Sequence, residues 1–139
     1  MAGYSQRPLI EKLGVRTEAR AIILRAPQGY VDLMPELSQR AQLVTRLAGL
    51  FDFIQYFATS TEQLEAVLPN LKRHLQSDGM LWITWAKRTS PLHSGLTETI
   101  VRRLVLEVGL VDVKVAALTD DWSGLKFVYR LADRPRNQP

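Results

Sequence analysis

The polar side chains that could do chemistry in this sequence follow its apolar, strand-like runs. They are Gln28 and Tyr30, Thr59 and Ser60, then Lys87 and Arg88 with Thr89 and Ser90 behind them. The carboxyl ends of parallel strands meet at one edge of a sheet, and ligands of such sheets bind outside that edge. We therefore expect these groups to converge on one ligand site. Trp122 joins them if the turn that holds it folds over the same edge.

The basic pair Lys87 and Arg88 is the best single site in this set. Two cations followed by the hydroxyls of Thr89 and Ser90 could hold an anion through charge-assisted hydrogen bonds. The amino termini of nearby helices would add their positive ends. The alternative is a solvated loop, because basic pairs are common on protein surfaces.

Each of the other candidates also has a structural explanation. Ser60 is explained by a helix cap, in which Gln63 reaches back to the amide of the cap residue. Trp122, expected in a tight turn, either fills the core or forms a recognition surface. Tyr30 could stack on a ring or serve as an apolar anchor after the first strand.

Several kinds of chemistry are excluded by residue type. The chain has no cysteine, which rules out thiolate nucleophiles, disulfides and zinc sites that need sulfur. His74 and His93 lie far apart in sequence, and neither has an acid or hydroxyl at motif spacing. We predict no catalytic residue and no metal site. The adjacent acids Asp120 and Asp121 are typical of a turn.

The elements that must position these residues alternate between strand-like runs and amphipathic helical patterns. This rhythm predicts an α/β fold: a three-layer, Rossmann-like, mostly parallel sheet that ends in an antiparallel hairpin. Strands are expected at residues 20–26, 41–47, 51–58 and 80–86, with the hairpin at 111–118 and 125–131. Helices are expected at 8–14, 30–37, 60–75 and 97–108, and a turn at 77–79.

Composition indicates one water-soluble domain. We expect a single domain over residues 1–132 and a flexible tail over 133–139, where proline and polar residues dominate. No segment has the apolar length of a membrane span, and no secretory leader pattern begins the sequence, so the expected location is the cytoplasm. The net charge is +4, and the lysines and arginines are scattered among acids along the chain. This distribution does not favour a nucleic-acid partner.

The layout of the predicted elements resembles that of S-adenosylmethionine-dependent methyltransferases. Residues 51–54 (FDFI) are similar to the fourth strand of that family, and residues 71–83 (LKRHLQSDGMLWI) to its helix, turn and fifth strand. These phrases are structural and carry no chemistry. The resemblance therefore implies the methyltransferase-like fold rather than the reaction.

The chain also resembles, nearly end to end, a family of small bacterial proteins known only as a domain of unknown function. The resemblance rests on GYS at 3–5 with PL at 8–9 and KLG at 12–14, AP at 26–27 with GY at 29–30, LTE at 96–98, and GLVD at 109–112 with WSGL at 122–125. It implies no activity.

The features that hold the methyltransferase cofactor are missing from the sequence. A Rossmann-type sheet uses glycines after its first strand and an acid after its second to bind the nucleotide. Residues 25–30 contain a single glycine with Pro27, and Tyr30 would add bulk where a nucleotide needs space. Arg46 stands where the acid is expected. The sequence thus predicts a degenerate cofactor site and no cofactor, with S-adenosylmethionine considered and set aside.

These observations favour a non-catalytic ligand-binding or protein-interaction module on a degenerate methyltransferase-like fold. One alternative is an enzyme that acts on a phosphate-bearing or other anionic small molecule at Lys87 and Arg88; a true methyltransferase ranks below it. Another is a small homo-oligomer, because the apolar final strands must be paired or covered at an edge. A cavity beside Pro27, Tyr30 and Lys87 would favour a ligand, and a filled site would favour a protein partner.

Overall fold

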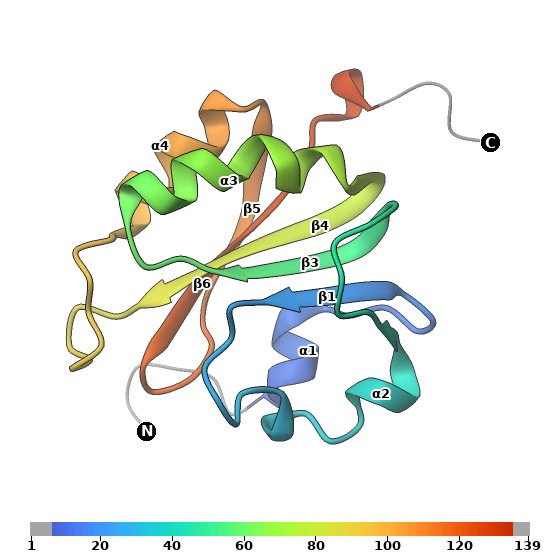
Figure 1. Ribbon diagram of the computed structural model, residues 1–139, viewed down its shortest axis with the longest axis horizontal. Helices are drawn as coiled ribbons and strands as arrows, with labels where there is room; N and C mark the ends of the chain where they lie inside the picture. Colours follow the sequence, from blue (N-terminus) through green and yellow to red (C-terminus); the bar gives the residue numbers. More distant parts are fainter. Residues whose placement is uncertain (1–6, 135–139) are drawn as a thin grey trace.

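A computed structural model describes residues 7–134 and has a six-stranded sheet at its centre. The strand order is β2-β1-β3-β4-β6-β5, with parallel pairing from β2 to β4 and antiparallel pairing of β6 with both β4 and β5 (Figure 1). The prediction of a mostly parallel, Rossmann-like α/β sheet with a carboxyl-terminal antiparallel hairpin is confirmed.

The elements follow one another as the sequence pattern indicated. The strands are β1 Arg20–Leu24, β2 Gln42–Leu43, β3 Phe51–Phe57, β4 Leu75–Ala86, β5 Leu110–Ala117 and β6 Trp122–Tyr129. The helices are α1 Leu9–Leu13, α2 Leu37–Arg40, α3 Thr61–Arg73 and α4 Glu98–Glu107, with short 3-10 turns η1 Val31–Leu33 and η2 Leu131–Asp133.

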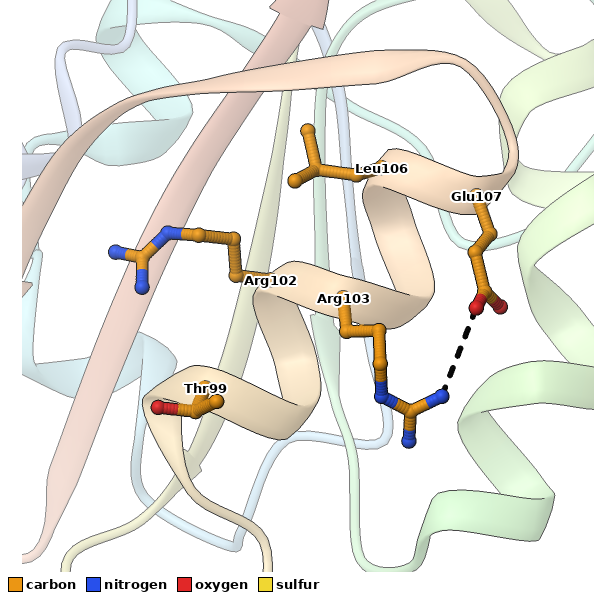
Figure 2. A pocket seen from close by; sticks show the side chains of 5 residues that line it. All are labelled: Thr99, Arg102, Arg103, Leu106 and Glu107. Carbon is orange, nitrogen blue, oxygen red and sulfur yellow. Dashed lines mark ion pairs between the residues drawn. The ribbon is translucent and has the colours of Figure 1, made fainter.

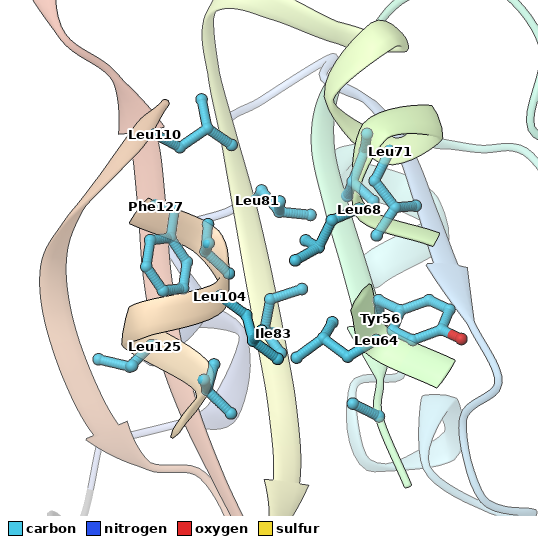
Figure 3. Close-up of a cluster of buried hydrophobic side chains, with 14 of the residues drawn as sticks. Tyr56, Leu64, Leu68, Leu71, Leu81, Ile83, Leu104, Leu110, Leu125 and Phe127 are labelled. Atoms are coloured by element: carbon cyan, nitrogen blue, oxygen red, sulfur yellow. The ribbon is translucent and has the colours of Figure 1, made fainter. Parts of the chain in front are cut away.

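Helices cover both faces of the sheet. Figure 1 shows α3 and α4 over one face and α1 and α2 over the other. On β3, Ile54 and Tyr56 join the hydrophobic cluster beneath α3 and α4, whereas Phe53 and Phe57 join the cluster beneath α1. This division follows from the two-residue repeat of a strand. Figure 3 shows the first of these clusters, in which leucines of α3 and α4 meet the side chains of β4 and β6.

Helix α1 is fixed to the sheet by hydrogen bonds at its carboxyl end. Gly14 ends the helix in the left-handed conformation, with φ of 72°, as the sequence predicted. The Trp82 indole Nε1 donates to the Leu13 carbonyl at 2.9 Å, and Lys114 Nζ donates to the Lys12 carbonyl at 2.8 Å. These bonds pair helix carbonyls that have no partner inside the helix.

Four local expectations are wrong. The helix expected at 30–37 is a 3-10 turn at Val31–Leu33, and the next α-helix, Leu37–Arg40, begins only where the expected one ends. Residues 77–79 do not form a turn: they lie inside β4, where the register with β3 shifts. Gly79 permits this irregularity, because a Cβ there would lie 2.9 Å from the Phe51 carbonyl oxygen. The second strand contains only Gln42–Leu43 of the expected 41–47. Trp122 is not in a tight turn: it is the first residue of β6.

The expected flexible tail at 133–139 falls largely outside the described residues, and so does the GYS phrase at 3–5. None of the helices within residues 7–134 is long and apolar enough to cross a membrane.

We predict that Trp82→Phe lowers the free energy of unfolding by about 1 kcal/mol more than Trp85→Phe does. Both replacements remove part of a buried indole ring. Only the first leaves a helix carbonyl without its donor, because the Trp85 indole N–H bonds to no protein group among residues 7–134. Urea unfolding of the two variants checks this, and equal midpoints at equal m-values would contradict it.

Candidate functional site

The chain leaves β1 through an unusual turn. Arg25 adopts a left-handed backbone with φ of 61°, a conformation that costs a non-glycine residue about 1 kcal/mol. Gly29 follows with φ of 86°, and a Cβ placed on it would meet no atom within 4 Å. The backbone at Gly29 therefore borders open space at the carboxyl end of β1.

Tyr30 turns inward from this loop and joins a buried polar network. Its hydroxyl lies 2.9 Å from Gln55 Nε2 and 3.1 Å from Gln55 Oε1, while Gln55 Nε2 also donates to Thr84 Oγ1 at 3.0 Å. Tyr30 is 3% exposed, and Gln55 and Thr84 are fully buried. The network links the β1 loop to the centres of β3 and β4.

Tyr30 also begins a row of three aromatic rings. It packs edge-on against Phe57 at 4.7 Å between centroids, and Phe57 packs edge-on against Trp122 at 5.1 Å. Edge-to-face contacts of this kind stabilise aromatic pairs beyond the area that they bury. The row joins the β1 loop to the start of β6.

An open cavity of about 320 Å³ lies between this loop and the β5–β6 turn. This first cavity is lined by Pro27, Gln28, Gly29, Tyr30, Leu33, Leu92, Thr119, Asp121 and Trp122. The expectation that Tyr30 takes up the space of a nucleotide is wrong, because its side chain is directed into the core toward Gln55. The space beside the loop is open.

A second cavity, of about 230 Å³, lies at the carboxyl end of β4. It is lined by Trp85, Lys87, Arg88, His93, Leu96, Thr97, Glu98 and Ser123. Leu92 and Trp122 line the first cavity, and their neighbours His93 and Ser123 line the second. The loop after β4 and the start of β6 therefore form a wall between the two cavities.

The residues expected to form one site are divided by the structure. Gln28, Tyr30 and Trp122 line the first cavity, Lys87 and Arg88 line the second, and Thr59 lines neither. Thr59 instead donates its amide and hydroxyl to Gln63 Oε1, at 2.8 and 3.1 Å. Ser60 caps α3 by accepting from the Gln63 amide. In a capping box the Gln63 side chain would bond the Ser60 amide, but here it bonds the amide of Thr59, one residue earlier.

Sequence reasoning missed Leu33, Leu92, Thr119 and Asp121 at the first cavity. Asp121 lies close to the loop after β4 because its carbonyl accepts from the Lys87 amide at 2.8 Å. The only sequence signal was the pair of acids beside Trp122, which is typical of any turn.

A larger hollow of about 440 Å³ lies on the outer surface of α4, lined by Thr99, Arg102, Arg103, Leu106 and Glu107. Figure 2 shows that these side chains come from one helix, with Arg103 paired to Glu107. Arg102 is held by Glu98 and Asp112. Because both arginines have acidic partners and no second element contributes side chains, we do not take this hollow as the functional site.

Within residues 7–134, no three His, Asp or Glu side chains gather to form a metal site. The first cavity therefore offers chemistry of another kind: an aromatic wall, one carboxylate, and amide and hydroxyl groups. A ligand with a flat ring and a cationic or hydrogen-bonding portion suits such a lining.

The strand order and the terminal hairpin define a methyltransferase-like Rossmann sheet, and solved structures share it. Magnesium protoporphyrin IX methyltransferase from Synechocystis PCC 6803 with bound SAH matches with a TM-score of 0.60 and 13% identity, over 87% of this chain and 78% of that chain. Ribosomal protein L11 methylase from Lactobacillus delbrueckii subsp. bulgaricus gives 0.58 and 15%, over 88% and 75%. Aeropyrum pernix fibrillarin with S-adenosyl-L-methionine gives 0.52 and 13%, over 86% and 73%. Because the sequence identities are so low, these matches show that the chain shares the fold of those proteins.

No protein-family model and no curated protein matches the chain. The resemblance to the small bacterial family of unknown function accordingly stays a prediction. The prediction of no cofactor is corrected by the solved structures. Solved proteins with this sheet hold bound SAM or SAH, so the fold does not support the expected absence of a cofactor.

The buried network predicts how stability depends on pH. Burial raises the pKa of Tyr30 well above its ordinary value, although the Gln55 hydrogen bond acts in the opposite direction. The unfolded tyrosine loses its proton first, so Tyr30 stabilises the fold fully below about pH 10 and progressively less above it. We expect Tyr30→Phe to reduce the alkaline loss of stability, by up to about 1.4 kcal/mol per pH unit.

Urea midpoints of wild type and Tyr30→Phe between pH 8 and 11 measure this difference. Tyr129→Phe is the matched control, because burial also raises the pKa of Tyr129 but its side chain is only partly buried. Parallel curves for wild type and Tyr30→Phe would show that Tyr30 ionises alike in both states.

Proposed function

We propose that this chain binds S-adenosylmethionine or S-adenosylhomocysteine in the first cavity. The observation that carries the proposal is the open space of about 320 Å³ at the carboxyl end of β1. Sheets of this order hold nucleotide ligands outside the carboxyl ends of their strands, where the strand order reverses. Here that point lies between β1 and β3, which are neighbours in the sheet but not in the chain.

The lining supplies contacts that suit such a ligand. Trp122 offers an aromatic face to the adenine ring or to the positive sulfonium. The Asp121 carboxylate suits the ammonium of the methionyl part. The open side of Gly29 lets a ligand approach the backbone, which is the role of a glycine in a longer glycine-rich loop.

Two departures from the usual pattern indicate a weaker or altered mode of binding. Val44, Thr45 and Arg46 follow β2, so no acid stands there for the ribose hydroxyls. Pro27 lines the cavity and contributes no amide donor. The residues around the first cavity therefore support a binding function on a methyltransferase-like fold.

We expect calorimetry to detect S-adenosylhomocysteine binding to the wild-type protein. Trp122→Ala should weaken it about tenfold or more, because a buried stacking ring contributes on the order of 1–2 kcal/mol. Trp122→Phe should retain most of the affinity. Asp121→Asn, which removes the charge and preserves the shape, should weaken binding several-fold.

Leu106→Ala on the outer surface of α4 serves as the control and should bind like wild type. Because Trp122 also packs on Phe57, thermal unfolding must show that each variant is folded at the temperature of the titration. Absence of binding by S-adenosylmethionine and S-adenosylhomocysteine at millimolar concentration would refute the proposal.

A further inference from the structure

The second cavity has a lining unlike that of the first. Trp85 and Leu96, at 5% and 2% exposure, form its apolar part. Ser123 pairs directly with Trp85 across the β4–β6 ladder, so the hydroxyl and the indole lie on the same face of the sheet. The neighbouring residue Trp122 belongs to the opposite face, which is why the two cavities are separate.

Positive charge dominates this cavity. Lys87 and Arg88 come from the loop after β4, and His93 lines the cavity from the same loop. The lining includes one acid, Glu98, and its Oε2 is paired with Arg102 Nη2 at 2.6 Å. The Arg88 guanidinium makes no hydrogen bond or ion pair with a protein group in residues 7–134.

The Trp85 indole adds a donor that the protein does not use. Only 5% of Trp85 is exposed, yet its Nε1 has no hydrogen-bond acceptor within the described part of the chain. Within residues 7–134, every polar side-chain atom that is fully buried has a hydrogen-bond partner. Because the Trp85 Nε1 has none, it is not fully buried, and it is accessible from the cavity that Trp85 lines. A ligand oxygen in the cavity would satisfy it.

We propose that the second cavity binds the oxyanion group of a small ligand, a phosphate monoester or a carboxylate attached to an apolar body. The Arg88 guanidinium supplies charge-assisted hydrogen bonds and Lys87 adds positive charge, while the Trp85 indole and the Ser123 hydroxyl supply neutral hydrogen bonds. Leu96 and the Trp85 ring contact the apolar body. The volume of about 230 Å³ limits that body to roughly one ring. This site is distinct from the first cavity and does not depend on adenosyl binding.

The three tryptophans provide an experiment that reads each site separately. In a nitrogen–proton correlation spectrum, phenyl phosphate and benzoate should shift the Trp85 indole signal, which a Trp85→Phe spectrum assigns. The Trp82 signal should stay in place, because its N–H is bonded to Leu13. The Trp122 signal reports on the first cavity, so failure of the adenosyl proposal and failure of this one are distinguishable.

Arg88→Gln should weaken the binding of phenyl phosphate about tenfold, and Arg88→Lys should restore part of the affinity. Arg88 is exposed, and its replacement should leave thermal stability unchanged. Arg103→Gln is the control, since Arg103 is an exposed arginine of α4 that does not line the second cavity. Benzyl alcohol, which lacks the anion, should not bind.

The comparison of phenyl phosphate with benzoate decides between a phosphate and a carboxylate ligand. No shift of the Trp85 signal with either compound at ten millimolar would overturn the proposal. Equal losses in Arg88→Gln and Arg103→Gln would overturn it too, because they would indicate attraction to the overall positive charge.

Discussion

The hydrogen-bonded network of Tyr30, Gln55 and Thr84 is the interaction on which the candidate site depends. A buried amide between two buried hydroxyls must find its partners within the protein, because an unpaired group there costs on the order of 1–3 kcal/mol. Here each hydroxyl meets Gln55 within 3.1 Å. The requirement draws Tyr30 inward, and with it the loop that follows β1 is fixed against β3.

This constraint explains how a turn poor in glycine still leaves room for a ligand. A glycine-rich loop makes space by lacking side chains. In this chain the bulky side chain of the turn is directed into the core, and the loop borders the cavity with Pro27, Gln28 and Gly29. The sequence suggested that Tyr30 fills the ligand site. In the folded chain Tyr30 instead anchors the loop to β3, and the cavity beside the loop is open.

The fold was predictable because its signals are local, and the division of the site was not. Apolar runs predicted β1, β3 and β4. Ser60 and Thr97 cap the amino ends of α3 and α4, and Gly14 ends α1, as expected. The bulge at 77–79 depends on contacts between Gly79 and Phe51, which lie in different strands. Likewise, Tyr30 and Lys87 both follow strands at one sheet edge, but the bond to Gln55, a residue of another strand, holds Tyr30 at the first cavity, whereas Lys87 lines the second.

The register of β6 makes both cavities depend on the β5–β6 turn. Trp122 and Ser123 are consecutive residues of β6, and the two-residue repeat of a strand places one on each face. Asp121 binds the loop after β4 through the Lys87 amide, so the positions of Leu92 and His93 depend on the same contact. A change in the β5–β6 turn therefore alters both cavities at once. A change at Arg88 alters only the second, because Arg88 contributes to that lining without supporting the wall.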